Sequence, residues 1–133
     1  MTQTAKGTFT VALKPLPFEG GDATTKLGRM SIDKEIRGDL AATTQGQMLT
    51  GMTETSGSAV YVAVERVVGT LHGKRGSFLL HHRGIMDRGA PSLQVAVVPD
   101  SGADELLGIT GEFTIVNENG QHRYEFHYRL PAK

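Results

Sequence analysis

Apolar and polar residues alternate along most of this chain, in short runs separated by glycine and proline. Alternation with a period of two is typical of a β-strand that buries one face. In residues 8–14, for example, Phe9, Val11 and Leu13 fall on the same face. No segment carries a helix-period stripe of useful length. The pattern predicts eight strands, over residues 8–14, 28–37, 40–53, the two halves of 58–82, 93–98, 112–116 and 121–130.

Turn signals connect these strands as neighbours. Asn119-Gly120 predicts a type I′ hairpin, because that turn needs positive φ at both central residues. Pro15 and Pro17 are expected to end the first strand, since proline cannot donate to the ladder. The result is an antiparallel meander, and closure into a barrel would remove its exposed edges. The sequence therefore predicts an all-β barrel with little or no helix, apart from a single turn at 104–107.

The segment 58–82 reads as two apolar strands around a polar turn. Whether that turn has two or four residues, one face of the hairpin combines Tyr61, Glu65 and His82 with apolar residues. A four-residue loop places Glu65 directly opposite His82, and a two-residue loop places them on a diagonal. Both loop lengths predict a polar set inside the barrel.

The other face of this hairpin carries Val60, Val62 and Val64. A strand that is apolar on both faces is covered on both. A single-layer barrel of this length has little chain to spare for its outside. We therefore expect a homo-oligomer with these valines at the subunit interface.

The hairpin centred on Asn119-Gly120 divides in the same way. Its inner face is aromatic and its outer face is polar, with Glu112 opposite His127 and Thr114 opposite Glu125. His127 is interpreted as a surface residue. The predicted inner face holds Phe113, Ile115, Tyr124, Phe126 and Tyr128.

Composition narrows the class of protein. The 133 residues predict one domain over 1–133, with residues 1–6 as a flexible tail. The chain has 14 basic residues (lysine plus arginine) and 14 acidic residues (aspartate plus glutamate). This balance of charge does not favour nucleic-acid binding. Cysteine is absent, which excludes disulfides and thiolate chemistry. The first six residues lack the apolar core of a secretory signal, and no apolar run approaches membrane-span length. We expect a cytoplasmic, bacterial protein without a membrane partner.

Glu65 and His82 are the candidate chemical groups. One interpretation is a general acid/base pair or ligand anchor, because a carboxylate beside a histidine tunes proton transfer near neutral pH. The other is a buried ion pair that fixes the strand register, to which the side chain of Arg66 or Arg83 could extend. His81 and His82 point to opposite faces and so predict no shared metal site.

Several longer motifs carry a family resemblance. They are G-T-F-T-V, K-L-G-R-M-S-I-D-K-E-I-R-G-D-L, V-E-R-V-V-G-T-L-H-G-K-R-G-S-F-L-L-H-H-R-G, the pairing of V-V-P-D-S-G with E-L-L-G-I-T-G-E, and Y-E-F-H-Y-R-L. Across residues 7–130 the chain resembles a bacterial family of unknown function with an allene oxide cyclase-like (calycin-like) barrel. The resemblance implies an eight-stranded barrel and no particular activity. Related barrels include cyclases and dirigent-like proteins, whose functional residues have no match here.

Three functions follow from this sequence. The first is binding of an apolar or aromatic small molecule in the barrel, without cofactor or metal. The second is a cofactor-independent cyclase or isomerase in which Glu65 and His82 move a proton. The third is a filled barrel that acts through its oligomeric surface. The predicted ligand contacts are Tyr61, Glu65, Phe78, Leu80, His82, Phe113, Tyr124 and Phe126, in a lumen also lined by Phe9, Val11, Met30, Ile32 and Tyr128.

Overall fold

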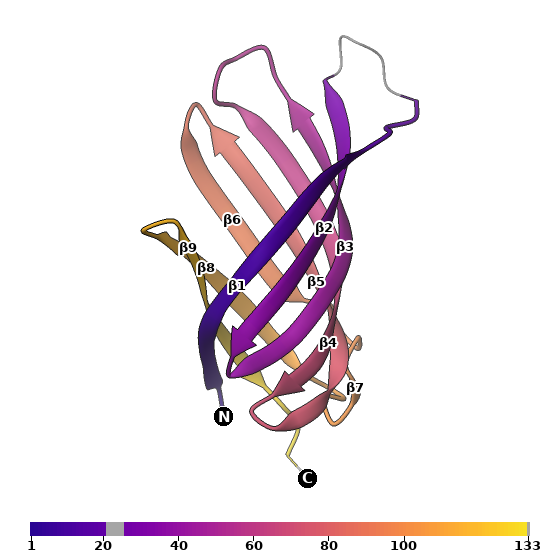
Figure 1. Ribbon diagram of the computed structural model, residues 1–133, viewed down its shortest axis with the longest axis vertical. Coiled ribbons are helices and arrows are strands. Elements are labelled where there is room, and N and C mark those ends of the chain that lie inside the picture. Colours follow the sequence, from indigo (N-terminus) through magenta and orange to yellow (C-terminus); the bar gives the residue numbers. More distant parts are fainter. Residues whose placement is uncertain (21–25, 133) are drawn as a thin grey trace.

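A computed structural model describes residues 1–20 and 26–132 (Figure 1). These residues form β-strands and turns, and they contain no helix long and apolar enough to cross a membrane. The strands are β1 (Gln3–Leu16), β2 (Leu27–Gly38), β3 (Leu40–Met52), β4 (Ala59–Leu71), β5 (Lys74–Asp87), β6 (Ala90–Val97), β7 (Ala103–Asp104), β8 (Thr110–Glu118) and β9 (Gln121–Arg129).

Eight of these strands close into an antiparallel barrel. Strands β1 to β6 pair in sequence order, β6 pairs with β8, β8 with β9, and β9 returns to β1. The short strand β7 lies outside this ring and adds two residue pairs to β5. The predicted eight-stranded antiparallel meander is confirmed, and Figure 1 shows the long, tilted strands that form its wall.

The hairpins are tight because their central residues adopt positive φ. Asn119 and Gly120 have φ of 51° and 76°, which confirms the predicted type I′ turn. His72 and Gly73 do the same, with φ of 46° and 82°, and Leu71 pairs with Lys74. The loop between β4 and β5 therefore has two residues, which decides between the two loop lengths left open by the sequence.

The start of the chain differs from the prediction. Residues 1–6 were expected as a flexible tail, but β1 begins at Gln3, which pairs with Tyr128 of β9. Ala5 is fully buried. The physical reason is closure: without these residues β9 would present a free edge.

The end of β1 also differs. Pro15 does not end the strand, because it pairs with Met30 of β2. Pairing of β1 with β9 extends only to Phe9, so Pro15 lies on a part of β1 with a free edge. Proline is tolerated on an edge, where no second neighbour needs its N–H. The segment 100–111 forms β7 and a turn rather than a helix, in agreement with the single turn predicted.

Aromatic side chains fill one half of the barrel. Phe113 stacks on Phe126 with ring centroids 4.1 Å apart, and Phe126 also stacks on Phe78 and Tyr128. The Tyr124 hydroxyl donates to the carbonyl of Arg37 and accepts from the Leu40 amide. The predicted inner face of β8 and β9 is confirmed, and this half is a packed core.

The other half of the barrel has an incomplete wall. Strand β6 pairs with β8 only at Val95 and Ala96, and β1 leaves β9 after Phe9. Figure 1 shows the β8–β9 hairpin ending well short of the β3–β4 and β5–β6 connections. Strands β2 to β6 therefore continue upward around a space that β8 and β9 do not cover.

Candidate functional site

A buried ionic cluster joins three strands inside the barrel. The Glu65 Oε1 atom of β4 accepts from Lys34 Nζ of β2 at 2.9 Å and from His82 Nε2 of β5 at 2.5 Å. The side chains of Glu65, His82 and Lys34 are 0%, 1% and 7% exposed. A buried charge is tolerated when it is paired and hydrogen-bonded, and here both donors meet one carboxylate oxygen.

Strand β3 makes room for this cluster. Gly46 lies directly opposite Glu65, and a Cβ atom on Gly46 would fall 2.6 Å from the Glu65 Cβ and 2.4 Å from the Val64 carbonyl oxygen. Any larger residue there would push the strands apart. Thr44, on the same strand, accepts a hydrogen bond from the Lys34 backbone N–H at 3.0 Å. Strand β3 thus leaves room for Glu65 and holds the backbone of Lys34.

The cluster keeps Glu65 ionised. Burial by itself would raise the pKa of this carboxyl group. The hydrogen bond from His82 and the charges of Lys34 and His82 outweigh burial and lower the pKa of Glu65 to about 2. Because His82 donates through Nε2, its Nδ1 atom is the one that faces the Tyr61 hydroxyl.

The cation that pairs with Glu65 was not predicted from the sequence. Arg66 and Arg83, the cations proposed for this role, lie exposed on the outer face. Lys34 takes their place. It has the same strand parity as Met30 and Ile36, so the alternation of β2 already assigned it an inward position. A lysine on the apolar face of this strand was therefore the sequence signal for a buried cation.

Tyr61 lies above the cluster. Its hydroxyl is 3.5 Å from His82 Nδ1, at the outer limit for a hydrogen bond. Its ring crosses Gly84 on β5, where a Cβ atom would lie 2.2 Å from the ring. Burial, followed by the negative charge of Glu65, raises the pKa of Tyr61 above its ordinary value. Tyr61 therefore keeps its proton at neutral pH.

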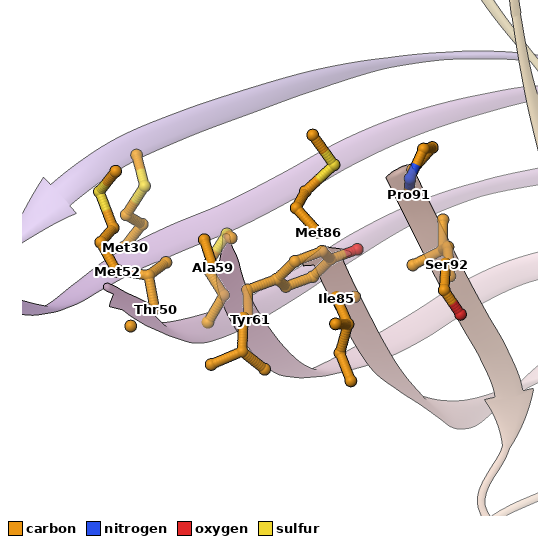
Figure 2. A pocket seen from close by; sticks show the side chains of 14 residues that line it. Met30, Thr50, Met52, Ala59, Tyr61, Ile85, Met86, Pro91 and Ser92 are labelled. Atoms are coloured by element: carbon orange, nitrogen blue, oxygen red, sulfur yellow. The ribbon is translucent and has the colours of Figure 1, made fainter. Parts of the chain in front are cut away.

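An apolar pocket opens on the other side of Tyr61, at the incompletely walled end of the barrel (Figure 2). Its volume is about 520 Å³, within the ordinary range for small-molecule sites. Methionine is the most frequent residue in its described lining, which includes four of the five methionines of the chain. The lining residues are Met30, Met48, Thr50, Gly51, Met52, Ala59, Val60, Tyr61, Gly84, Ile85, Met86, Pro91, Ser92 and Leu93.

The predicted ligand contacts divide between pocket, cluster and core. Among them only Tyr61 lines the pocket. Glu65 and His82 lie in the ionic cluster, as the predicted polar pair. The aromatic and aliphatic members, Phe78, Leu80, Phe113, Tyr124 and Phe126, form or contact the packed core.

The methionines were missed as a group, although Met30 was placed in the predicted lumen. Met48, Met52 and Met86 all have inward parity, on strands whose neighbours face the same space. Their spacing in the sequence shows no motif, so only the barrel brings them together. Within residues 1–20 and 26–132, no three His, Asp or Glu side chains converge as a metal site.

The fold and site define a small antiparallel β-barrel with one packed half, a buried ionic cluster and an apolar pocket at the incompletely walled end. The chain belongs to the DUF3224 family, described as proteins of unknown function, which it matches over residues 5–128. A crystal structure from Shewanella oneidensis MR-1, also of a DUF3224 protein of unknown function, is 46% identical. It aligns over 100% of both chains with a TM-score of 0.94. Comparison with curated proteins gave no match.

Proposed function

We propose that this protein binds an apolar small molecule in the methionine-lined pocket. The observation that carries the proposal is a 520 Å³ pocket in which none of the lining residues that the structure describes is charged. Ligand sites are mostly apolar concave surfaces with a few polar groups that fix orientation. Methionine suits such a site, because its flexible thioether adapts to ligands of different shape.

The position of the ligand differs from the lumen first expected. The aromatic half of the barrel is filled by its own side chains, so the space for a ligand lies beyond Tyr61. The filled-barrel hypothesis thus describes one half of the molecule and the binding hypothesis the other. The allene oxide cyclase-like label stays a prediction and contributes only an analogy of fold.

The cyclase or isomerase hypothesis has less support. Glu65 and His82 would have to exchange a proton with the ligand, yet their side chains are at most 1% exposed and neither lines the pocket. Any proton exchange would pass through Tyr61. Binding therefore remains the function we propose.

A neutral fluorescent probe, N-phenyl-1-naphthylamine, tests the proposal. We expect saturable binding of one probe per chain, with fluorescence enhancement in the apolar pocket. Ala59→Trp places a large side chain in the pocket and should weaken binding at least tenfold. Ala41→Trp, at an exposed position of β3, is the matched control and should change the affinity less than twofold. Absent probe binding, or equal binding by both variants, would contradict the proposal.

We also infer that a second copy of this chain covers the outer face of β4. Val60, Val62 and Val64 are 43–56% exposed there, as the strand parity predicted. Beside them lies a shallow hollow lined by Asp33, while Arg83 neighbours Val62 on the opposite flank. A twofold axis along β4 would bring Asp33 of one copy toward Arg83 of its partner. Cytoplasmic location stays a prediction that rests on the cysteine-free composition.

A further inference from the structure

The methionine-lined pocket offers a ligand very few polar groups. Among the lining residues in the described part of the chain, only Thr50, Tyr61 and Ser92 have polar side chains. By strand parity Ser92 has the outward orientation of β6, so the inward hydroxyls belong to Thr50 and Tyr61, which are cross-strand neighbours. The Thr50 hydroxyl is attached to Cβ, close to the wall. The Tyr61 hydroxyl lies at the end of a ring, and Figure 2 shows it pointing toward Met86, Pro91 and Ser92.

The Tyr61 hydroxyl lacks a good partner. Within the described residues its hydrogen-bond contact is His82 Nδ1, at 3.5 Å. Neutral hydroxyl bonds are usually about 2.7–2.8 Å long, so this contact satisfies the hydroxyl poorly. A half-buried hydroxyl with such a weak contact gains free energy when a ligand atom completes its hydrogen bonding.

The surrounding charges determine which ligand atom suits it. Tyr61 remains protonated, so its O–H donates and the ligand supplies an acceptor. Within the ionic cluster the Glu65 charge is paired with Lys34, so the ligand meets an uncharged, apolar lining, where an unpaired carboxylate is costly. Among the described residues, no lysine or arginine lines the pocket to pair with an anion. A neutral oxygen fits these conditions and a carboxylate does not.

We propose that the ligand is an apolar molecule with one neutral carbonyl oxygen, which accepts a hydrogen bond from Tyr61 at the inner end of the pocket. This inference rests on the proposed function and adds the chemical class of the ligand. The carbonyl group enters first and the apolar body contacts the methionines.

Three probes of nearly the same shape test this assignment: 2-acetylnaphthalene, 2-isopropenylnaphthalene and 2-naphthoate. The first two differ only in C=O against C=CH₂. Tyr61→Phe should weaken binding of the ketone about three- to tenfold, the value of one neutral hydrogen bond, and leave the hydrocarbon within twofold. Thr50→Val, which removes the other inward hydroxyl, should preserve the effect. The infrared carbonyl band of the bound ketone should move to higher frequency in Tyr61→Phe, a change that loss of packing would not produce.

The outcomes separate this inference from the proposed function. If no naphthalene probe binds the wild-type protein, the proposed function is wrong. If ketone and hydrocarbon both bind but Tyr61→Phe affects them equally, the pocket is a binding site and the carbonyl assignment is wrong. Tighter binding of 2-naphthoate than of the ketone at pH 7 would also overturn it, because it would show that the site accepts an anion.

Discussion

At the scale of single residues, Glu65 shows how a charge is kept in an apolar interior. One of its oxygens accepts from both Lys34 and His82, while Oε2 is buried without a partner among the described residues. Removing one member of such a group leaves another charge buried and unpaired, which usually costs about 3–5 kcal/mol. The cluster therefore makes the stability of the barrel depend on the ionised state of one side chain.

This dependence predicts a pH effect. The pKa of Glu65 falls from 4.5 to about 2 on folding, so its stabilising contribution is present above pH 4.5 and is lost as the pH falls toward 2. We expect Glu65→Gln to lose about 3 kcal/mol of unfolding free energy at pH 7 and progressively less below pH 4.5. Urea denaturation at several pH values measures the difference.

The matched control for this prediction is Glu35→Gln. Glu35 lies on the same sheet but is 56% exposed and pairs with Arg37 at the surface. Its replacement should change stability by no more than about 0.5 kcal/mol at any of these pH values. A pH-independent loss in Glu65→Gln would show that the carboxylate contributes shape rather than charge.

At the scale of elements, the first residues of β1 close the barrel. Gln3 to Lys6 pair with β9, and Ala5 points into the core while Lys6 points outward. The alternation of Thr4, Ala5 and Lys6 is too weak to predict a strand. Pairing with β9 makes these residues a strand, because β9 would otherwise have a free edge.

Two substitutions of the same kind test this closure. Ala5→Gln puts a polar amide into a fully buried position and should cost at least about 2 kcal/mol. Lys6→Gln, one residue further on the exposed face, should stay within about 0.5 kcal/mol. Chemical denaturation provides the measurement. If both variants match the wild type, residues 1–6 are the flexible tail expected from the sequence.

At the scale of the whole molecule, the outer valines distinguish a monomer from an assembly. We expect the wild-type chain to self-associate at micromolar concentration, and Val62→Lys to be monomeric, because a charge in the centre of an apolar interface is costly. Val116→Lys is the control, since Val116 of β8 is also exposed, at 38%, but lies on a different wall. Light scattering coupled to size-exclusion chromatography gives the masses. A wild-type monomer at high concentration would refute the interface.

Much of the fold could be predicted from the sequence. Alternation with a period of two is a local property, so it gave the eight strands, the faces of Tyr61, Glu65 and His82, and the outward direction of Val60, Val62 and Val64. Turn chemistry is local as well, and Asn119-Gly120 forms the expected type I′ turn. These features need no knowledge of distant residues.

The tertiary structure decided the partners and the pocket. Lys34 is paired with Thr44 in the sheet register and Glu65 with Gly46, so they meet only because the strands tilt and curve around the barrel. The pocket exists because the β8–β9 hairpin stops short of the β3–β4 and β5–β6 ends, which no local pattern encodes. The chain by itself thus determined which residues face inward. Strand stagger and closure, which are non-local, determined which inward residues pack, pair or remain open to a ligand.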